Sequence, residues 1–345
     1  MKYRSVGAAD LRLSEIGFGC GGTAGLMIRG SFEERLAVVA RALELGINYF
    51  DEAPDYGDGE SETNLGRVLK ELDARPVITT KVEVREADLA DVAGHVERSV
   101  DASLRRLGLD QVDIVQIHNG PVATSPALRG RDYRVLGIGD YLGPRGALEG
   151  LRRIRAAGKA RYLGFVCRGD DAPEVRQLID TGEFSLINIA YSLLNPSATI
   201  PPIPGMEVEA DFGQVVPYAA AHGVGVVVYS PLASGVLSDG AQDGEEPHRL
   251  SGLAGREVSE TRRLQLARAS RLRFLSDGQG TTLAQAAIRF VLTCPDVTTV
   301  LAGVSDLQQL EETAAASELG PLPQDQLTQV EAAWRDNLGM PSGAG

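Results

Sequence analysis

The sequence predicts a closed (β/α)8 barrel, the TIM-barrel class of α/β proteins, with an N-terminal β-hairpin before the first strand. Strand-like and helix-like patterns alternate about eight times along the 345 residues, without a break in composition. Three consecutive apolar runs also end on ionisable residues, at Asp51, Lys81 and His118. Barrel enzymes of this class carry their catalytic residues at the C-terminal ends of several strands. We therefore expect a single domain over residues 1–345, with a disordered tail at 340–345.

The main alternative fold is an open, doubly wound parallel sheet. Such a sheet carries a glycine-rich phosphate-binding turn after its first strand, and residues 17–22 of this chain are rich in glycine. The large number of consecutive strand-then-helix units nevertheless favours a closed barrel over an open sheet.

The first half of the chain gives clear local signals. Residues 3–19 are typical of a short hairpin that leads into a first strand at 15–19. Ser31 and Glu34 form a capping-box pattern that begins a helix, and Gly46 stands where such a helix ends. The elements expected next are strands at 47–51, 76–81 and 112–118 and helices around 61–72 and 88–107.

The second half continues the alternation, with three long loops after the fourth, sixth and seventh strands. These loops are an irregular Gly-, Pro- and Arg-rich stretch at 119–145, a Pro-rich loop at 195–213 and a segment at 235–258. Strands are expected at 161–166, 185–190, 224–229 and 298–301. Helices are expected at 146–157, 171–181, 214–222, 259–276, 282–293 and 324–337, and one more is capped from Ser305.

Composition excludes several classes of partner. The net charge of −13 argues against nucleic acid and against an anionic membrane surface, because both require clustered positive charge. Cys20, Cys167 and Cys294 lie far apart and show no metal-ligand spacing, so we expect no metal site and a reducing compartment. The N-terminus has no apolar signal segment, and no run approaches the ~20 apolar residues of a membrane span. A cytoplasmic protein is expected, and its oligomeric state is not predicted.

Four residues at the expected strand ends form a proton-transfer constellation. Tyr56 follows Asp51 by five residues, and a free tyrosine, with a pKa near ~10, is protonated at neutral pH and can give a proton to a developing alkoxide. A neighbouring Lys81 ammonium would lower that pKa by ~1–3 units. Asp51 would keep Lys81 charged, and a neutral His118 would donate an N–H to the same oxygen. This chemistry suits reduction of a carbonyl or oxidation of an alcohol with a nicotinamide cofactor.

Each of the four residues also has a structural interpretation. Asp51 can be a cap, Tyr56 can be wall packing, and His118 can be a satisfied polar residue at a strand end. Lys81 can be a solvated strand end or a Schiff-base lysine of a barrel lyase. Their occurrence together on three consecutive strands favours the catalytic interpretation.

The segment GINYFDEAPDYGDGESE, residues 46–62, resembles the signature of the aldo-keto reductase superfamily around its catalytic Asp and Tyr. With Thr80-Lys81 and Ile117-His118 on the next two strands, the resemblance extends from about residue 3 to residue 320. It implies catalytic roles for Asp51, Tyr56, Lys81 and His118, and NAD or NADP bound without a Rossmann domain. The context of Thr181 and Asn195 is loosely similar to the sugar-dehydrogenase branch of the superfamily.

The resemblance also implies a cofactor site at the ends of strands five to eight. An aromatic residue of the family stacks on the nicotinamide, the loop after it runs along the diphosphate, and a loop after the last strand holds the adenosine phosphate. The capped helix start at Ser305 suits an anion. The corresponding residues of this chain are Cys167, Asn188, Tyr229, Ser230, Pro231, Leu232, Gly235, Gly303, Ser305 and Gln309.

The chain departs from the family pattern where the nicotinamide carboxamide binds. The family often ends strand five with Gly-Val-Ser-Asn, but here Val166 cannot make the serine hydrogen bond and Cys167 makes the asparagine bond weakly. Asn188 replaces a glutamine that is one methylene longer. Glu52 replaces Thr or Ser, and alternation along the strand directs it away from the barrel axis.

The choice between NAD and NADP depends on basic residues near the adenosine. NADP-specific relatives carry Lys or Arg in the loop after the last strand, where this chain has Gly303 and Gln309. We therefore expect dual use or a lean towards NAD, unless Arg256, Arg262 or Arg263 reaches the 2′-phosphate.

The substrate is expected to be a small carbonyl compound, alcohol or sugar. The 119–145 loop adjoins His118 and is expected to form part of the substrate wall, although it can also be a mere surface excursion; the 195–213 loop is a second candidate wall. Side chains that the first loop offers are Arg129, Arg131, Tyr133, Arg134 and Tyr141. The alternative to an enzyme is a nicotinamide-binding regulatory module with little turnover, as in family members that accompany ion channels.

Overall fold

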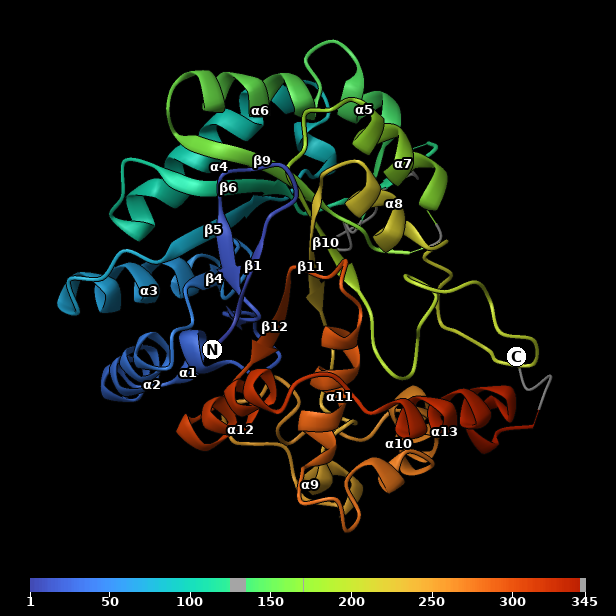
Figure 1. Ribbon diagram of the computed structural model, residues 1–345. Helices are drawn as coiled ribbons and strands as arrows, with labels where there is room; N and C mark the ends of the chain where they lie inside the picture. The colour runs from blue at the N-terminus through green and yellow to red at the C-terminus, as the bar shows by residue number, and fades with distance from the viewer. Residues whose placement is uncertain (125–134, 170, 342–345) are drawn as a thin grey trace.

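The computed structural model describes residues 1–124, 135–169 and 171–341, and within them eight parallel strands form a closed barrel (Figure 1). Each strand pairs with the next along the chain, and the last closes the ring by pairing with the first. This confirms the (β/α)8 barrel expected from the sequence. The barrel strands are β3 (Ile16–Gly19), β4 (Tyr49–Asp51), β5 (Val77–Val82), β6 (Val112–Ile117), β9 (Ala160–Val166), β10 (Leu186–Ala190), β11 (Gly225–Tyr229) and β12 (Thr299–Gly303).

Helices surround the barrel, as Figure 1 shows. The longer ones begin at the expected signals; for example, Ser31 and Glu34 form a capping box. The main helices that follow the eight barrel strands, in order, are α2 (Phe32–Glu44), α3 (Glu60–Glu71), α4 (Val92–Leu107), α6 (Ala147–Ala156), α7 (Ala172–Asp180), α8 (Val215–Ala221), α11 (Leu283–Thr293) and α12 (Leu307–Leu319). Additional helices are α1 (Leu26–Arg29), α5 (Ile138–Leu142), α9 (Asp239–Gln242), α10 (Glu260–Ser270) and α13 (Gln324–Arg335), with 3-10 turns at Glu86–Asp88, Arg273–Leu275 and Asn337–Gly339.

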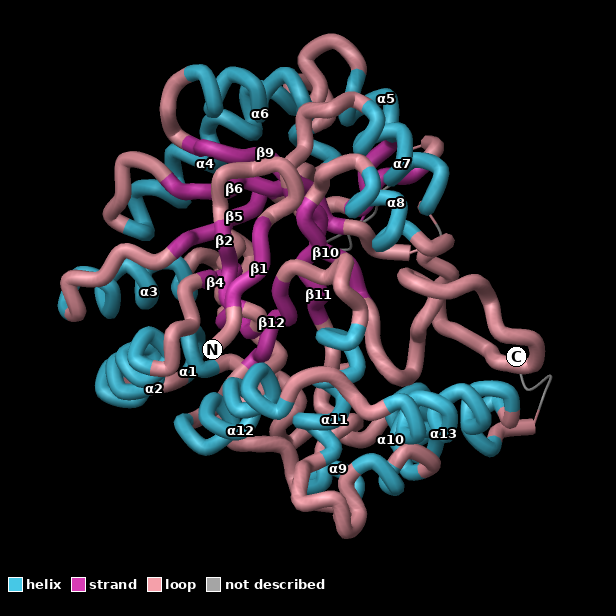
Figure 2. Tube along the Cα trace, in the orientation of Figure 1, coloured by secondary structure: helices cyan, strands magenta, loops and turns pink. Residues whose placement is uncertain are grey.

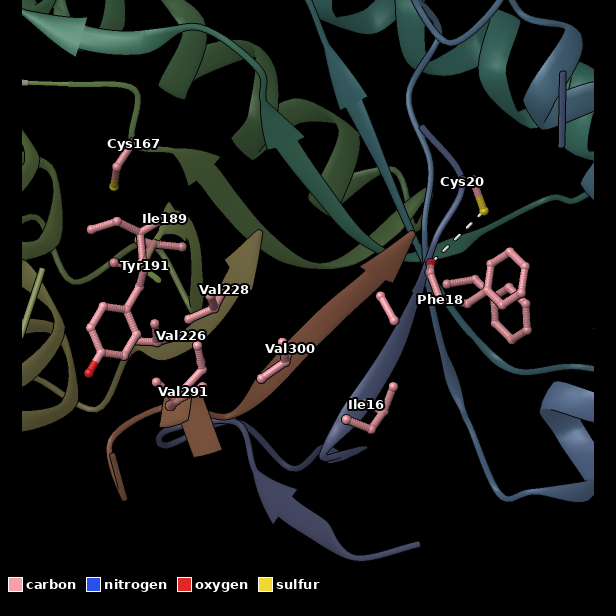
Figure 3. Packing of buried hydrophobic residues seen from close by; sticks show 14 of the residues in the cluster. Ile16, Phe18, Cys20, Cys167, Ile189, Tyr191, Val226, Val228, Val291 and Val300 are labelled. Carbon is pink, nitrogen blue, oxygen red and sulfur yellow. Dashed lines mark hydrogen bonds between the residues drawn. The ribbon is translucent and has the colours of Figure 1, made fainter. Parts of the chain in front are cut away.

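The strands bury both of their faces, which explains their nearly continuous apolar runs. Outward-facing side chains such as Ile16, Phe18 and Val300 belong to the main core that Figure 3 shows in part. A second, smaller cluster includes Tyr49, Ile114 and inward-facing residues of three other strands. The inside of the barrel is therefore a packed core at this level.

An antiparallel hairpin of β1 (Tyr3–Ser5) and β2 (Arg12–Ser14) covers the N-terminal ends of the barrel strands. Val6 and Leu13 are buried in the same cluster as Tyr49. A side chain on Gly225, the first residue of β11, would come within 2.6 Å of Val6. The hairpin thus closes this end, and the site described below lies at the opposite end.

The glycines of residues 17–22 serve packing within a strand. Gly17, Gly19 and Gly22 have the G-x-G-x-x-G spacing of an open-sheet phosphate turn, but Gly17 and Gly19 lie inside β3. A Cβ atom on Gly17 would be 2.8 Å from Cδ1 of Tyr49. Here the absence of a side chain makes room for a buried ring inside the barrel.

Two expected segments differ from the structure. The 119–145 stretch, expected to be irregular, contains β7 (Gly120–Val122) and β8 (Val135–Gly137), which pair with each other, and then α5. Its Leu136 and Tyr141 are fully buried, and this packing outweighs the turn-forming composition of the segment. The helix expected at 259–276 ends at Ser270 and is followed by a 3-10 turn.

The long connection after β10 is visible as loop in Figure 2. Its beginning is fixed by Trp334 of α13, whose indole N–H donates to the carbonyl of Leu193 at 2.8 Å. Its middle is fixed by Asn337, whose side-chain oxygen accepts from the N–H of Glu207 at 3.0 Å. In the part of the chain that the structure describes, no helix has the length and apolarity needed to cross a membrane.

Candidate active site

Lys81 is the centre of a buried hydrogen-bond network at the C-terminal ends of β4 and β5. The strand register sets Asp51 beside Thr79, so that Lys81 reaches over the end of β4. Its ammonium donates to Oδ1 of Asp51, to the carbonyl of Glu52 at 2.8 Å and to the hydroxyl of Tyr56 at 3.2 Å. Burial would lower the pKa of Lys81, but Asp51 and Tyr56 raise it well above its usual value. The group is therefore an ammonium ion at neutral pH and not the free amine that a Schiff-base nucleophile requires.

Asp51 is held in place by two further donors from the barrel interior. Its Oδ2 accepts from the hydroxyl of Tyr49 at 3.2 Å and from the side-chain amide of Asn188 at 3.0 Å. Gln116 in turn donates to Oδ1 of Asn188 at 2.6 Å. Side chains from β4, β6 and β10 therefore fix the carboxylate, and the carboxylate fixes the ammonium.

Tyr56 lies in the turn after β4, and its ring makes a T-shaped contact with that of His118. The N–H of Tyr56 donates to the carbonyl of Ala53 at 3.1 Å, and Gly21 faces the ring. Burial raises the pKa of Tyr56 above its usual value, although the Lys81 charge acts in the opposite direction. Lys81 thus acts on the pKa of Tyr56 in the direction expected from the sequence, but burial outweighs it and the net pKa lies above the usual value. Tyr56 is accordingly a protonated donor at neutral pH.

His118 follows β6 and is anchored through its backbone, whose N–H donates to the carbonyl of Val82 at 2.8 Å. The ring centroids of Tyr56 and His118 are 6.0 Å apart, with planes at 82°. Nδ1 of His118 lies 3.1 Å from Oδ1 of Asp55. Burial lowers the pKa of His118 to about 4, so the imidazole is neutral at neutral pH. All four residues expected from the sequence thus meet at one end of the barrel.

Asp55 was not predicted from the sequence as a site residue. It immediately precedes Tyr56 in the signature segment, and an acidic residue in a turn gives no signal of its own. Burial alone would raise the pKa of Asp55, but hydrogen bonding and attraction to His118 lower it below its usual value. Asp55 is therefore a carboxylate that faces the imidazole.

Most of the residues expected to bind the dinucleotide lie at or after the C-terminal ends of β11 and β12. Tyr229 ends β11 half-buried, and its hydroxyl donates to the carbonyl of Cys167 at 2.8 Å. The following loop contains Ser230, Ala233 and Ser234 at positive φ, a strained backbone typical of ligand-binding turns. A half-exposed ring followed by such a turn fits a flat nicotinamide and a diphosphate.

The loop after β12 is placed beside the glycine-rich segment. A Cβ atom on Gly303 would be 3.3 Å from Cβ of Ala24. Ser305 is buried and donates its hydroxyl to the carbonyl of Ala24 at 2.9 Å. Gln309 accepts from the N–H of Ser305 at 2.9 Å. The helix α12 is capped by Asp306 rather than by Ser305, because Asp306 accepts from the N–H of Gln309.

Two of the expected carboxamide ligands are engaged in other contacts. Cys167 belongs to the outer hydrophobic core and is drawn with it in Figure 3. Asn188 uses its oxygen for Gln116 and one amide hydrogen for Asp51. Oε1 of Gln116 is buried without a partner among the described residues, and a carboxamide N–H is a donor that would satisfy such an acceptor.

Glu52 lies behind the site, between β4 and α3, where alternation directs it away from the barrel axis. It is fully buried and accepts from the hydroxyl of Ser61 at 2.9 Å. Burial and the nearby Glu62 raise the pKa of Glu52 to about 8. Among the described residues, no group of His, Cys, Asp and Glu side chains could hold a metal ion.

Comparisons with known proteins show the family of this chain. The model of the aldo/keto reductase family matches residues 15–335. The chain is 27% identical to L-galactose dehydrogenase of Arabidopsis thaliana, over 99% of this chain and 98% of that protein. It is 28% identical to a putative voltage-gated potassium channel subunit beta of Schizosaccharomyces pombe, over 92% and 88%.

Among solved structures, the fold is similar to that of the holo form of aldo-keto reductase AKR11C1 from Bacillus halodurans. The TM-score is 0.69 at 25% identity, with 96% of each chain covered. The family model extends from the residue before β3 to the end of α13. The chain belongs to the aldo/keto reductase family.

Proposed function

We propose that the protein is an NAD(P)-dependent oxidoreductase that interconverts a carbonyl compound and its alcohol, with Tyr56 as the general acid or base. The observation that carries this proposal is the buried chain from Asp51 through Lys81 to the Tyr56 hydroxyl. Such a chain holds one phenol at a fixed position next to a permanent positive charge. Membership of the family supports the coarser statement that nicotinamide-dependent oxidoreduction takes place.

The roles of the side chains follow from their contacts. In the reducing direction, the Tyr56 hydroxyl gives its proton to the carbonyl oxygen, and Lys81 stabilises the phenolate that forms. Asp51 keeps Lys81 charged in a buried position where a lone ammonium would lose its proton. Tyr229 and the backbone at 230–235 would hold the nicotinamide and diphosphate, with Gly303 and Gln309 towards the adenosine. The dinucleotide, when bound, supplies or accepts the hydride.

For the cofactor, we propose use of NAD or dual use of NAD and NADP. The loop after β12 offers Gly303 and Gln309, which carry no positive charge. Arg262 donates to the carbonyl of Ser234 at 2.9 Å, whereas Arg256 and Arg263 are exposed. Binding of NADH and NADPH, followed by cofactor fluorescence, tests this choice, and a clear preference for NADPH contradicts it.

For the substrate, we propose a small polyhydroxylated carbonyl compound or sugar. One relative over nearly the full chain is a dehydrogenase of L-galactose. Tyr141, expected in the substrate wall, is buried and donates to the carbonyl of Asn119. Arg129, Arg131, Tyr133 and Arg134 lie outside the described residues.

The test is turnover of aldoses, aldehydes and alcohols with both cofactors, by the wild type and by Tyr56→Phe. Loss of the acid is expected to reduce turnover by ~10²–10⁴-fold, with unchanged dinucleotide affinity. The matched control is Tyr218→Phe, since Tyr218 is a half-buried tyrosine of α8 whose hydroxyl donates to Asp180 at 2.6 Å. Cofactor binding without turnover of any compound, in wild type and control alike, would instead indicate a regulatory module.

A further inference from the structure

The imidazole of His118 faces a carboxylate that the catalytic roles described above do not require. Oδ1 of Asp55 lies 3.1 Å from Nδ1 of His118, and the Asp55 side chain is about one-third exposed (34%) while that of His118 is 8% exposed. Arg168 and Lys81, two further charged residues that act on this ring, make different contacts. Arg168 donates to the backbone carbonyl of His118 at 3.1 Å, and Lys81 bonds Asp51 and Tyr56.

We propose that Asp55 is a positioning residue that holds His118 in the tautomer with the proton on Nδ1, so that Nε2 accepts a hydrogen bond from a substrate hydroxyl. This inference rests on the proposed function for its substrate and deepens it. It assigns to His118 the opposite polarity from the N–H donor expected from the sequence.

A neutral imidazole carries one N–H donor and one acceptor nitrogen, and the partner of one nitrogen decides which of the two is protonated. An ionised carboxylate can only accept, so the nitrogen 3.1 Å from Asp55 carries the proton. Nε2, on the other side of the ring, is then a lone pair, which pairs with a hydroxyl and not with a carbonyl oxygen.

This polarity complements that of Tyr56. The protonated phenol donates to the reacting oxygen, and the lone pair of His118 accepts from a hydroxyl. Both contacts are satisfied together by a carbonyl compound with a neighbouring hydroxyl, such as an aldose. A simple aldehyde satisfies only the contact with Tyr56. The pair therefore selects hydroxylated substrates over plain aldehydes.

The tautomer can be measured directly on the protein without cofactor or substrate. Nitrogen-15 NMR of histidine-labelled protein distinguishes protonated from bare ring nitrogens, and the chain has four histidines, so His118→Gln assigns the signal. We expect the wild type to carry the proton on Nδ1 and Asp55→Ala to shift the proton towards Nε2. Asp58→Asn is the control, because Asp58 is an exposed carboxylate of the same turn at φ 52°, a conformation that asparagine accepts.

Kinetics provide the second measurement. Asp55→Ala is expected to lower kcat/KM for a hydroxylated substrate by ~10–100-fold, since an orienting carboxylate acts on catalysis through its histidine. The same change in a His118→Ala background is expected to have less than ~3-fold effect, because the two residues then act as one unit. In Asp55→Ala, kcat/KM should fall less for a plain aldehyde than for the hydroxylated substrate.

The outcomes separate this inference from the proposed function. A proton on Nε2 in the wild type, or a tautomer that Asp55→Ala leaves unchanged, overturns the inference even if the enzyme is active. The inference is also overturned if Asp55→Ala lowers kcat/KM by the same factor in the wild-type and His118→Ala backgrounds. A tautomer set by Asp55 in a protein without any turnover supports the inference and rejects the proposed function.

Discussion

At the scale of single residues, the buried ion pair of Asp51 and Lys81 carries both stability and chemistry. Both side chains are nearly inaccessible to solvent, so removal of one partner leaves the other charge buried and unpaired. Lys81→Met is therefore expected to lower the free energy of unfolding by ~3–5 kcal/mol and to reduce turnover by at least ~10²-fold. Denaturant unfolding and steady-state kinetics measure the two effects.

The control for that prediction is the double variant Asp51→Asn/Lys81→Met, which buries no charge. It should recover a large part of the lost stability and none of the activity. Lys70→Met, on the exposed side of α3, should change neither quantity. Equal stability of Lys81→Met and the wild type would contradict the buried-pair account.

Glu52 gives a residue-scale prediction about pH. Its pKa is about 8 in the folded protein against a usual value of 4.5, so between these values the folded chain keeps a proton that the unfolded chain has released. Stability therefore falls as pH rises from about 4.5 to about 8, by up to ~1.4 kcal/mol per pH unit. Glu52→Gln should remove this slope and be more stable than the wild type at pH 9. Thermal unfolding across pH measures the slope.

The comparison variant for Glu52 is Glu60→Gln, an exposed acid at the start of α3. It should keep the wild-type slope, because its charge is solvated in both states. A Glu52→Gln protein whose stability depends on pH as the wild type does would show that other groups cause the dependence.

At the scale of elements, the loop after β11 is held by a hydrogen bond from α10, the second helix after it. Arg262, in the first turn of α10, donates to the carbonyl of Ser234, one of the left-handed residues of that loop. Without this contact the free loop is less ordered, and ordering it on binding costs more conformational entropy. Arg262→Ala is therefore expected to weaken the binding of NADH and of NADPH by the same factor, ~3–10-fold. Fluorescence titration with both cofactors measures the two dissociation constants.

Arg263→Ala is the matched control, because Arg263 is exposed. This substitution should leave the affinities for NADH and NADPH unchanged. A loss confined to NADPH in Arg262→Ala would mean that Arg262 contacts the 2′-phosphate rather than only supporting the loop.

At the scale of the whole molecule, the barrel and the proton-transfer constellation could be predicted, because each expected strand end is visible in a short stretch of sequence. Apolar runs that end on Asp51, Lys81 and His118 identify strand ends, and closure of the barrel then brings those ends together. Asp55 could not be predicted in the same way, because its partner lies 63 positions away and only the fold sets the 3.1 Å contact between them.

Other differences also arise from tertiary contacts that a sequence does not display. The pKa of Tyr56 was predicted from one neighbour, Lys81, whereas burial by the complete barrel end determines its direction. The strand pair in the 119–145 stretch depends on burial of Leu136 and Tyr141, which turn-forming composition conceals. Residue types and their spacing thus predict which side chains meet, and tertiary packing determines their pKa values and the local secondary structure.

The closed end of the barrel gives a prediction that separates stability from function. Leu13 of the hairpin is fully buried in the same cluster as Tyr49 and Ile114, so Leu13→Ala leaves a cavity at the N-terminal end of the barrel. The free energy of unfolding should fall by ~2–5 kcal/mol, as measured by denaturant unfolding. Dinucleotide affinity should not change, because most of the residues proposed to bind the cofactor lie at or after the ends of β11 and β12.

Leu307→Ala serves as the comparison for Leu13→Ala, because Leu307 is 42% exposed and its truncation should cost less than ~0.5 kcal/mol. The hairpin touches the barrel through Tyr49, which also bonds Asp51. If the residues around the cavity shifted and moved Tyr49 with them, the ion pair of Asp51 and Lys81 would be disturbed. Turnover would then fall as well as stability. Unchanged turnover in Leu13→Ala, measured well below its unfolding temperature, is therefore the expected sign that the rigid barrel isolates the chemistry at one end from packing defects at the other.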